Sequence, residues 1–160
     1  MHRVFLYGTL KKGQPNHHHM LAWIQAGECV FEGTGVTETK YPLVVESLFK
    51  IPFLLDAPDA HNAVNVEGEV YSVNDKILDN LDNIERHPTF YTRLQIPIII
   101  DGKTEEIWCY LMQNFRKDFL QLPVHKKYDS RDFPPFMDGA KKPPTEEERR
   151  KFMAYIKESL

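Results

Sequence analysis

The stretch VEGEVYSVNDKILDNLDNIE, residues 66–85, predicts a strand that leads directly into a helix. Residues 66–71 alternate with a period of two, which is typical of a strand with one buried face. The pattern then changes to the spacing of an amphipathic helix, in which Leu78, Leu81 and Glu85 fall on one stripe. We expect this stripe to face the sheet.

Glu85 occupies a position on the apolar stripe where a hydrophobic residue is expected, and Ile84 flanks the stripe. A carboxylate at the edge of a core costs free energy unless it is hydrogen-bonded, protonated or used in chemistry. Two interpretations follow. Glu85 is either a structural residue paired with Arg86, Arg93 or a tyrosine, or a general acid/base whose pKa is raised toward neutrality by desolvation. Asp82 and Arg86 are predicted to lie on the outer face.

The remaining pattern is dominated by strands. Residues 94–100 and 107–112 form the arms of a predicted hairpin, joined by the turn signal Asp101-Gly102. Further short elements are predicted as strands at 4–7, around 33–35 and at 41–45, and as a short helix around 20–24. This order favours an α+β fold with a curved or barrel-like, antiparallel-rich sheet over a doubly wound fold.

The C-terminal part has a different character. Two Pro-Pro pairs bracket a linker, and Thr145 and Glu148 then form a capping box at the start of a helix. The helix carries an apolar stripe made of Phe152, Met153, Ile156 and Leu160. We expect this stripe to be buried on its own domain, with a second copy or a partner protein as alternatives.

Length and composition restrict the class of protein. The chain has 160 residues, of which 42% are hydrophobic and 27% charged, as in ordinary globular proteins that form one domain. Its net charge of −3 argues against binding to nucleic acid or to an anionic membrane. Two cysteines, Cys29 and Cys109, are too few for a disulfide framework, and the sequence shows no leader pattern or long apolar run. A cytoplasmic location is therefore expected.

The segment Tyr7-Gly8-Thr9-Leu10 ends the first predicted strand. Glycine at this place lets consecutive backbone N–H groups approach a ligand closely, and such a nest suits a carboxylate or another small anion. A simple turn is the alternative. The segment does not match the phosphate-binding loop, which needs a second glycine followed by lysine and serine or threonine.

Other patterns that could carry chemistry are weaker. The run His17-His18-His19 does not predict a metal site, because adjacent histidines cannot all point at one ion. Tyr91 follows the helix and could orient Glu85 or a ligand. Tyr128 belongs to a polar cluster near the linker that is expected at the surface.

Several segments together resemble the γ-glutamylcyclotransferase-like superfamily: VFLYGTLKKGQPNH at 4–17, YPLV at 41–44, VEGEVY at 66–71 and LDNIE at 81–85. The Gly-Gln-Pro-Asn-His part of the first segment is most similar to the γ-glutamylaminecyclotransferase branch. QLP at 121–123 and YDS at 128–130 also resemble that branch. The resemblance predicts a domain over residues 1–130 and leaves 131–160 as a proline-rich linker with a C-terminal amphipathic helix.

The resemblance implies a small mixed sheet or barrel with flanking helices and a reaction without a cofactor. It implies that Tyr7, Gly8, Thr9 and Leu10 hold the glutamyl part of the substrate and that Glu85 is the single catalytic residue. The implied substrate is the isopeptide ε-(γ-glutamyl)-lysine, which remains after proteolysis of transglutaminase-crosslinked proteins. Its products are 5-oxoproline and lysine.

Two other functions stay open. The chain could act on γ-glutamyl-amino acids or glutathione, or it could be a non-catalytic binding module. The leaving-group pocket decides the first choice, and its candidate residues are Phe53, Tyr91 and Tyr128. We expect a small-molecule γ-glutamyl amine as the substrate, no nucleic-acid or membrane partner, no metal and no cofactor. The expected assembly is a monomer or a weak homodimer.

Overall fold

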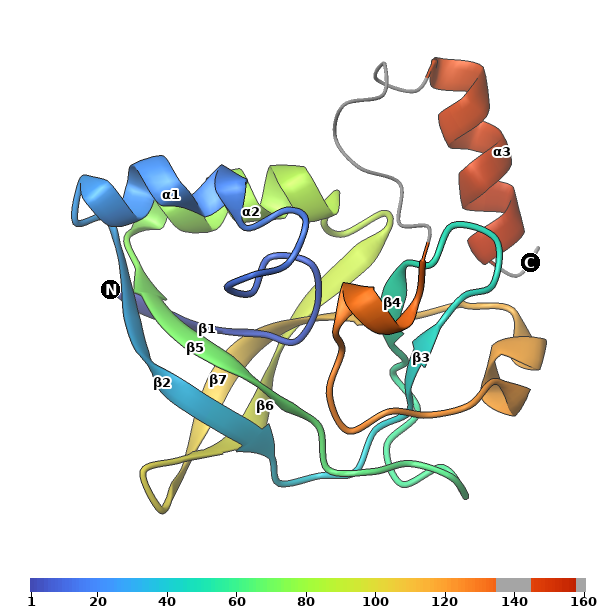
Figure 1. The fold of residues 1–160 in the computed structure, drawn as a ribbon, viewed down its shortest axis with the longest axis horizontal. Coiled ribbons are helices and arrows are strands. Elements are labelled where there is room, and N and C mark those ends of the chain that lie inside the picture. The colour runs from blue at the N-terminus through green and yellow to red at the C-terminus, as the bar shows by residue number, and fades with distance from the viewer. Residues whose placement is uncertain (135–144, 158–160) are drawn as a thin grey trace.

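The computed structural model describes residues 1–134 and 145–157 and has a closed five-stranded barrel at its centre (Figure 1). The strand order is β1-β5-β2-β6-β7. These strands are β1 (His2–Leu6), β2 (Cys29–Thr37), β5 (Glu67–Val73), β6 (Tyr91–Ile100) and β7 (Lys103–Met112). β1 pairs with β7 in parallel and the other pairs are antiparallel. The predicted α+β fold with a small mixed, antiparallel-rich barrel is therefore confirmed.

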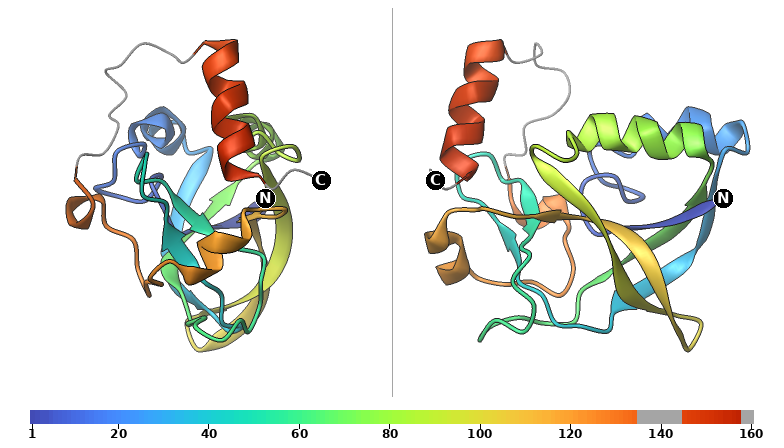
Figure 2. Two further views of the ribbon diagram at one scale, coloured as in Figure 1. Left: turned by 90° about the vertical axis from the view of Figure 1, so that its right-hand side faces the viewer. Right: turned by 180° about the vertical axis from the view of Figure 1, so that it is seen from behind.

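Helices flank the barrel on two sides. Figures 1 and 2 show α1 (His18–Gln25) and α2 (Asp75–Glu85) together over one side, and α3 (Glu146–Ile156) apart from them near a small two-stranded sheet. That sheet pairs β3 (Leu43–Val45) with β4 (Pro52–Leu54), and two 3-10 helices follow the barrel, η1 (Lys117–Gln121) and η2 (Ser130–Asp132). β4 was not predicted from the sequence, because a strand of three residues is too short to show a periodic pattern.

The hairpin of β6 and β7 turns at Asp101 and Gly102, as predicted. Both residues have positive φ angles, 52° and 73°, which give the twist that a two-residue connection between antiparallel strands requires. The register is continuous from Ile100 opposite Lys103 to Tyr91 opposite Met112. The hairpin therefore returns the end of β7, with Tyr110 and Met112, to the start of β6, which follows α2 closely in the chain.

Two hydrophobic clusters stabilise the fold. One joins side chains inside the barrel to the small β3–β4 sheet, and the other lies between the barrel and the helices. From α2, Ile77, Leu78 and Leu81 are buried in the second cluster. Ile84, which was predicted to flank the buried stripe, is instead 40% exposed. The buried face is therefore rotated relative to the predicted one.

The C-terminal helix begins at the predicted capping box. The hydroxyl of Thr145 accepts a hydrogen bond from the backbone N–H of Glu148 at 3.2 Å. Ile156 is fully buried in the cluster that also contains the α2 side chains. Leu160 and most of the predicted linker, residues 135–144, lie outside the described residues. The domain boundary at 130 stays a prediction.

No helix in the described part of the chain combines the length and the apolar character needed to cross a membrane.

The close approach of β5 to the end of β1 predicts a strict requirement for glycine at position 68. A Cβ on Gly68 would lie 2.5 Å from the carbonyl oxygen of Leu6 and 2.6 Å from the ring of Phe5. We expect Gly68→Ala to lower the free energy of unfolding by about 1–3 kcal/mol, as overpacking does. Urea unfolding followed by circular dichroism measures this, with Glu67→Ala on the exposed side of the same strand as the control. Equal stability of the two variants would contradict the assigned packing.

Candidate active site

A small pocket of about 50 Å³ opens where β1 ends. It lies between the loop after β1, the C-terminal end of α2 and the start of β4. Its lining residues are Phe5, Leu6, Tyr7, Gly8, Thr9, Leu10, Ile51, Pro52, Glu85, Tyr91 and Tyr110. The structure thus brings together Glu85, the Tyr7–Leu10 loop and Tyr91, which the sequence analysis selected from distant segments.

Asp82 fixes the orientation of α2 above this pocket. Its two carboxylate oxygens accept hydrogen bonds from Nε and the terminal nitrogen of Arg93 at 2.8 and 3.1 Å. The hydroxyl of Tyr110 donates to the same carboxylate at 2.6 Å. The prediction that Asp82 lies on the outer face is wrong. A helical pattern alone does not reveal a distant partner such as Arg93 on β6, which binds the Asp82 carboxylate.

Glu85 lies three residues further along the same face of α2. Among the described residues, no hydrogen bond or ion pair reaches its carboxylate, so the predicted pairing with Arg86 or Arg93 is not observed. Glu85 as a whole residue is partly exposed where it lines the pocket, and its carboxyl group is enclosed by protein. This desolvation raises the pKa of Glu85 from 4.5 to about 7.

The tyrosines around Glu85 are neutral hydrogen-bonding groups. Tyr7 donates to the carbonyl of Tyr110 at 2.6 Å, and Tyr91 donates to the carbonyl of Pro52 at 3.3 Å. Burial, with a smaller contribution from the nearby Glu85 charge, raises the pKa of both phenols well above 10. Among the described residues that line the pocket, Glu85 is therefore the group that exchanges its proton near neutral pH.

The loop after β1 presents backbone donors to the pocket. Within the described residues, the N–H groups of Gly8, Thr9 and Leu10 donate to no protein acceptor. A Cβ on Gly8 would lie 3.1 Å from Cγ of Pro52, so glycine keeps the space between the loop and β4 open. Three unused donors in residues that line the pocket are compatible with the anion-holding nest expected from the sequence, which stays a prediction.

The residues that follow hold this loop in shape. Asn16 donates from its side-chain amide to the hydroxyl of Thr9 at 3.0 Å, and from its backbone N–H to the carbonyl of Thr9 at 2.9 Å. Nδ1 of His17 hydrogen-bonds the carbonyl of Leu10 at 2.8 Å. From the sequence, Asn16 was considered only as part of the resemblance and His17 also as part of a histidine run, so their role in holding the loop was missed. No pattern in one sequence reveals such loop contacts.

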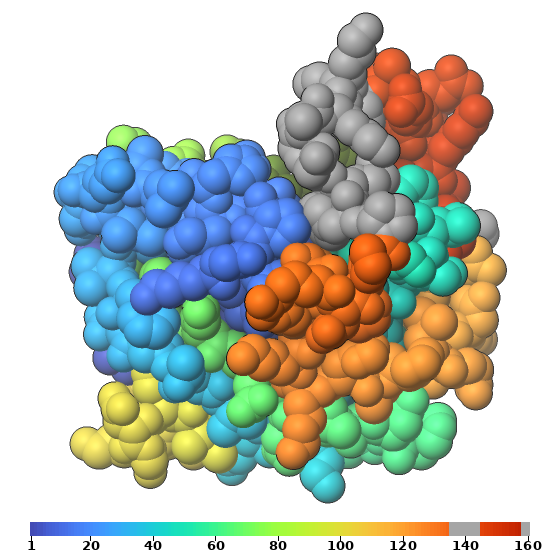
Figure 3. Space-filling view, viewed as in Figure 1, coloured from blue at the N-terminus to red at the C-terminus, as the bar shows by residue number. Residues whose placement is uncertain are grey.

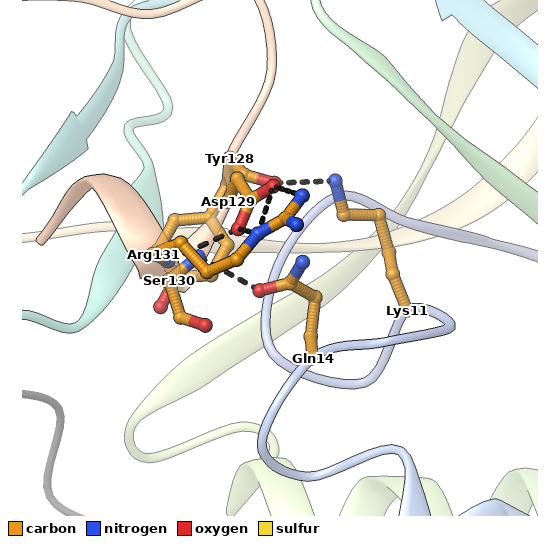
Figure 4. A network of polar contacts seen from close by, with 6 residues as sticks. All are labelled: Lys11, Gln14, Tyr128, Asp129, Ser130 and Arg131. Carbon is orange, nitrogen blue, oxygen red and sulfur yellow. Dashed lines mark hydrogen bonds and ion pairs between the residues drawn. The ribbon is translucent and has the colours of Figure 1, made fainter.

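A second segment, residues 128–131, is tied to the outer side of the loop (Figure 4). Nζ of the buried Lys11 donates to the carbonyl of Tyr128 at 2.7 Å, and the backbone N–H of Ser130 donates to the side chain of Gln14 at 2.8 Å. In Figure 3 the orange part of the chain that includes this segment lies directly beside the blue N-terminal part. Two loop segments more than a hundred residues apart in sequence thus hold each other in place next to the pocket.

Tyr128 is fully buried, although it was expected at the surface, and it is not among the pocket-lining residues. Phe53 is buried behind the pocket wall and contacts the ring of Tyr91, with 5.9 Å between centroids. Of the three candidates for the leaving-group pocket, only Tyr91 faces the cavity beside Glu85.

A larger groove of about 590 Å³ lies on the other side of the loop, over β2 and β5. Its charged residues include Glu67, Glu69, Lys127 and Arg131, and Glu85 is not among its lining residues. Within residues 1–134 and 145–157, no cluster of histidine, cysteine or acidic side chains is arranged to hold a metal ion. The smaller pocket is the one that combines a proton-exchanging group with free backbone donors.

Comparison with known proteins shows the family of the chain. Residues 4–133 match the family described as γ-glutamyl cyclotransferase, AIG2-like. The chain belongs to this family. It is 42% identical to γ-glutamylaminecyclotransferase C of Danio rerio, over 81% of this chain and 87% of that protein. It is 38% identical to the human γ-glutamylaminecyclotransferase, over 79% of this chain and 89% of that protein.

The fold comparison leads to the same family. The crystal structure of an AIG2-like protein from Mus musculus superposes with a TM-score of 0.78 at 31% identity, covering 90% of this chain and 99% of that one. The resemblance inferred from the sequence is therefore confirmed, and the family is one of cyclotransferase enzymes. Helix α3 lies beyond the residues that match the family.

Desolvation of Glu85 predicts a pH-dependent effect of removing its charge. Because the pKa of Glu85 is about 7 in the folded protein and 4.5 as the ordinary value, ionisation above neutral pH costs folding stability. We expect Glu85→Gln to leave stability nearly unchanged at about pH 4.5, where Glu85 is protonated. At about pH 8.5 the same variant should be more stable than the wild type by about 2–3 kcal/mol.

Urea unfolding of both proteins at the two pH values measures this difference. The comparison between variants removes the contributions of all other titrating groups. A stability difference that does not depend on pH would show that Glu85 is ordinarily solvated.

Proposed function

We propose that this chain is a γ-glutamylaminecyclotransferase that cleaves the isopeptide ε-(γ-glutamyl)-lysine to 5-oxoproline and lysine. The observation that carries the proposal is the position of Glu85. A carboxylate without a hydrogen-bond partner among the described residues shares one small pocket with the free N–H groups of Gly8, Thr9 and Leu10. Further support comes from relatives that bear the name γ-glutamylaminecyclotransferase.

The reaction is an internal displacement within the substrate. The α-amine nitrogen attacks the γ-carbonyl carbon and forms the bond that closes a five-membered lactam. The bond between that carbon and the ε-nitrogen of lysine then breaks, and the electron pair leaves with the nitrogen. Because nucleophile and electrophile belong to one molecule, holding them in a near-attack geometry can contribute about 7–11 kcal/mol. No water enters the products.

The α-nitrogen loses two protons as the ammonium group becomes the lactam N–H, and the departing ε-nitrogen gains two to leave as an ammonium group. Breaking the amide bond itself requires one proton to pass from the attacking nitrogen to the departing one. A single carboxylate can first accept it and then donate it if its pKa is close to the working pH. Glu85 meets this requirement, since desolvation raises its pKa to about 7. The neighbouring Tyr7 and Tyr91 keep their protons at this pH and cannot replace Glu85 as the base.

The loop after β1 supplies the complementary electrostatics. The substrate's α-carboxylate would accept hydrogen bonds from N–H groups of the Gly8–Leu10 loop, and the same loop would polarise the γ-carbonyl as its oxygen gains negative charge. Donors fixed in advance stabilise developing charge without reorganising, which makes such groups effective in catalysis. Asn16 and His17 hold the loop in this conformation through Thr9 and Leu10.

The identity of the leaving amine is the finer part of the proposal. Tyr91 and the edge of β4 at Pro52 form the pocket wall next to Glu85. A turnover panel of ε-(γ-glutamyl)-lysine, γ-glutamyl-alanine and glutathione, with 5-oxoproline detected by mass spectrometry, tests it. We expect the isopeptide to be converted fastest. Preference for either of the other compounds would assign the chain to a γ-glutamyl-amino acid or glutathione substrate instead.

Removing the base predicts a loss of turnover without a loss of fold. We expect Glu85→Gln to lower kcat for the isopeptide by roughly 100-fold or more, because the amide can neither accept nor return the proton. Glu67→Gln, which alters an exposed glutamate on β5, is the control and should keep wild-type activity. Near-normal turnover by a well-folded Glu85→Gln protein would remove Glu85 from the mechanism.

The same assignment predicts the pH profile. Glu85 must be ionised to accept the proton, so kcat/KM should rise with pH and level off above the Glu85 pKa of about 7. Below that value the rate should fall about tenfold for each pH unit. Initial rates between about pH 5 and pH 8.5 give the profile. An acid limb centred near the ordinary glutamate value would show that the pocket does not desolvate Glu85.

A further inference from the structure

Helix α3 is anchored to the barrel at its C-terminal end. The backbone N–H of Arg116 donates to the carbonyl of Ile156 at 3.1 Å, and Ile156 itself is fully buried. Nζ of Lys157 donates to the carbonyls of Phe90 and Gln113, each at 2.6 Å. Burial lowers the pKa of Lys157. These contacts fix one end of the helix beside the start of β6.

One turn earlier, Phe152 packs between two aromatic rings of the barrel domain. Its ring lies 4.8 Å from that of Phe49, edge to face, and 5.7 Å from that of Phe90. Tyr155 adds contacts on the same side, with its ring 6.2 Å from the rings of Phe49 and Phe119. Aromatic pairs at these separations add stabilisation beyond the apolar area that they bury.

The two rings that contact Phe152 are next to the pocket wall in sequence and in space. Phe90 precedes Tyr91 and packs edge to face against it at 5.0 Å. Phe49 precedes Ile51 and Pro52, which line the pocket. The wall closes where the hydroxyl of Tyr91 meets the carbonyl of Pro52 at 3.3 Å.

The loop that carries Phe49 is built on a buried carboxylate. Glu46 is fully buried, and its oxygens accept hydrogen bonds from the backbone N–H groups of Leu48, Phe49 and Ile51 at 2.9, 2.7 and 3.3 Å. These hydrogen bonds join the backbone at Phe49 to the backbone at Ile51 through one side chain. A contact that fixes Phe49 also fixes the pocket edge at Ile51.

We propose that α3 is a positioning element of the active site, in which Phe152 holds the Phe49 loop and Phe90 together and so sets the Tyr91–Pro52 wall. This inference rests on the proposed function for its meaning in catalysis. Phe152 does not line the pocket and acts through its neighbours, so it is a positioning residue. Phe152 lies beyond residues 4–133, which match the family model, whereas the superposition on the Mus musculus structure covers 90% of this chain.

In this proposal the wall that α3 supports also limits the hydration of Glu85. The titratable groups close to the Glu85 carboxylate are Tyr7, Tyr91, Cys109 and Tyr110, and burial raises the pKa of each of them. They are therefore neutral near pH 7, and none supplies a positive charge. If the wall opens, hydration of the carboxylate is the main change, and the Glu85 pKa should fall toward 4.5.

The experiment compares three full-length variants with the wild type. Phe152→Ala removes the ring, Phe152→Leu keeps part of the apolar volume, and Arg150→Ala changes an exposed residue of the same helix as the control. We expect Phe152→Ala to lower kcat/KM for the isopeptide by roughly 10- to 100-fold, because small misplacements in an active site have effects of this size. Phe152→Leu should give an intermediate loss.

Carbon-13 NMR titration of the Glu85 carboxyl provides a readout that does not depend on turnover. The Glu85 pKa should be highest in Arg150→Ala, lower in Phe152→Leu and lowest in Phe152→Ala. These values are compared under conditions where circular dichroism shows folded protein. If Phe152→Ala does not fold, Phe152→Leu must still show a lower Glu85 pKa than Arg150→Ala. Equal values of the Glu85 pKa in the Phe152 variants and in the control would overturn the inference. Absence of wild-type turnover would instead count against the proposed function and leave the pKa comparison as the test of α3.

Discussion

The ion pair between Asp82 and Arg93 determines how α2 sits on the barrel, and the pocket depends on that placement. Arg93 and Tyr110 face each other in the register of β6 and β7, and both donate to the Asp82 carboxylate. One side chain therefore ties the last turn of the helix to two strands at once. The side chains of Asp82 and Arg93 are only 17% and 16% exposed, so solvent screens the pair weakly. With this turn fixed, Glu85 has to project toward the end of β1.

The two carboxylates on this turn of α2 have opposite surroundings. Asp82 is paired with a guanidinium group, whereas Glu85 is enclosed by tyrosines and apolar atoms and lacks a partner among the described residues. Glu85 is also the last residue of the helix, where the aligned peptide dipoles leave partial negative charge and disfavour a second negative group. Desolvation is the main cause of its raised pKa, and the helix end acts in the same direction.

Sequence reasoning succeeded where one local pattern was enough and failed where a distant partner decided the outcome. Helical spacing placed Glu85 toward the core, and the Asp101-Gly102 signal placed the long hairpin, because both depend on residues close in the chain. The same spacing assigned Asp82 to the surface, since nothing near it indicates Arg93. Tyr128 was placed at the surface for the same reason, because the burial of its ring and its contact with Lys11 arise from chain segments more than a hundred residues apart. The catalytic and binding roles of the pocket residues came from the family resemblance and stay predictions.

A protein that catalyses an internal displacement needs few reactive groups and many contacts that position them. In the proposed reaction one carboxylate and three backbone N–H groups meet the chemical needs, and they come from the end of α2 and the loop after β1. The residues that fix these groups are far more numerous, and most of them never face the pocket. Asn16 and His17 hydrogen-bond the loop after β1, and Lys11 ties it to the 128–131 segment. Helix α3 contacts Phe49, close in sequence to the Tyr91–Pro52 wall of the pocket. In the proposed reaction the Gly-Gln-Pro-Asn-His segment would act through the shape of the loop, since Asn16 and His17 hydrogen-bond Thr9 and Leu10 and neither lines the pocket around Glu85.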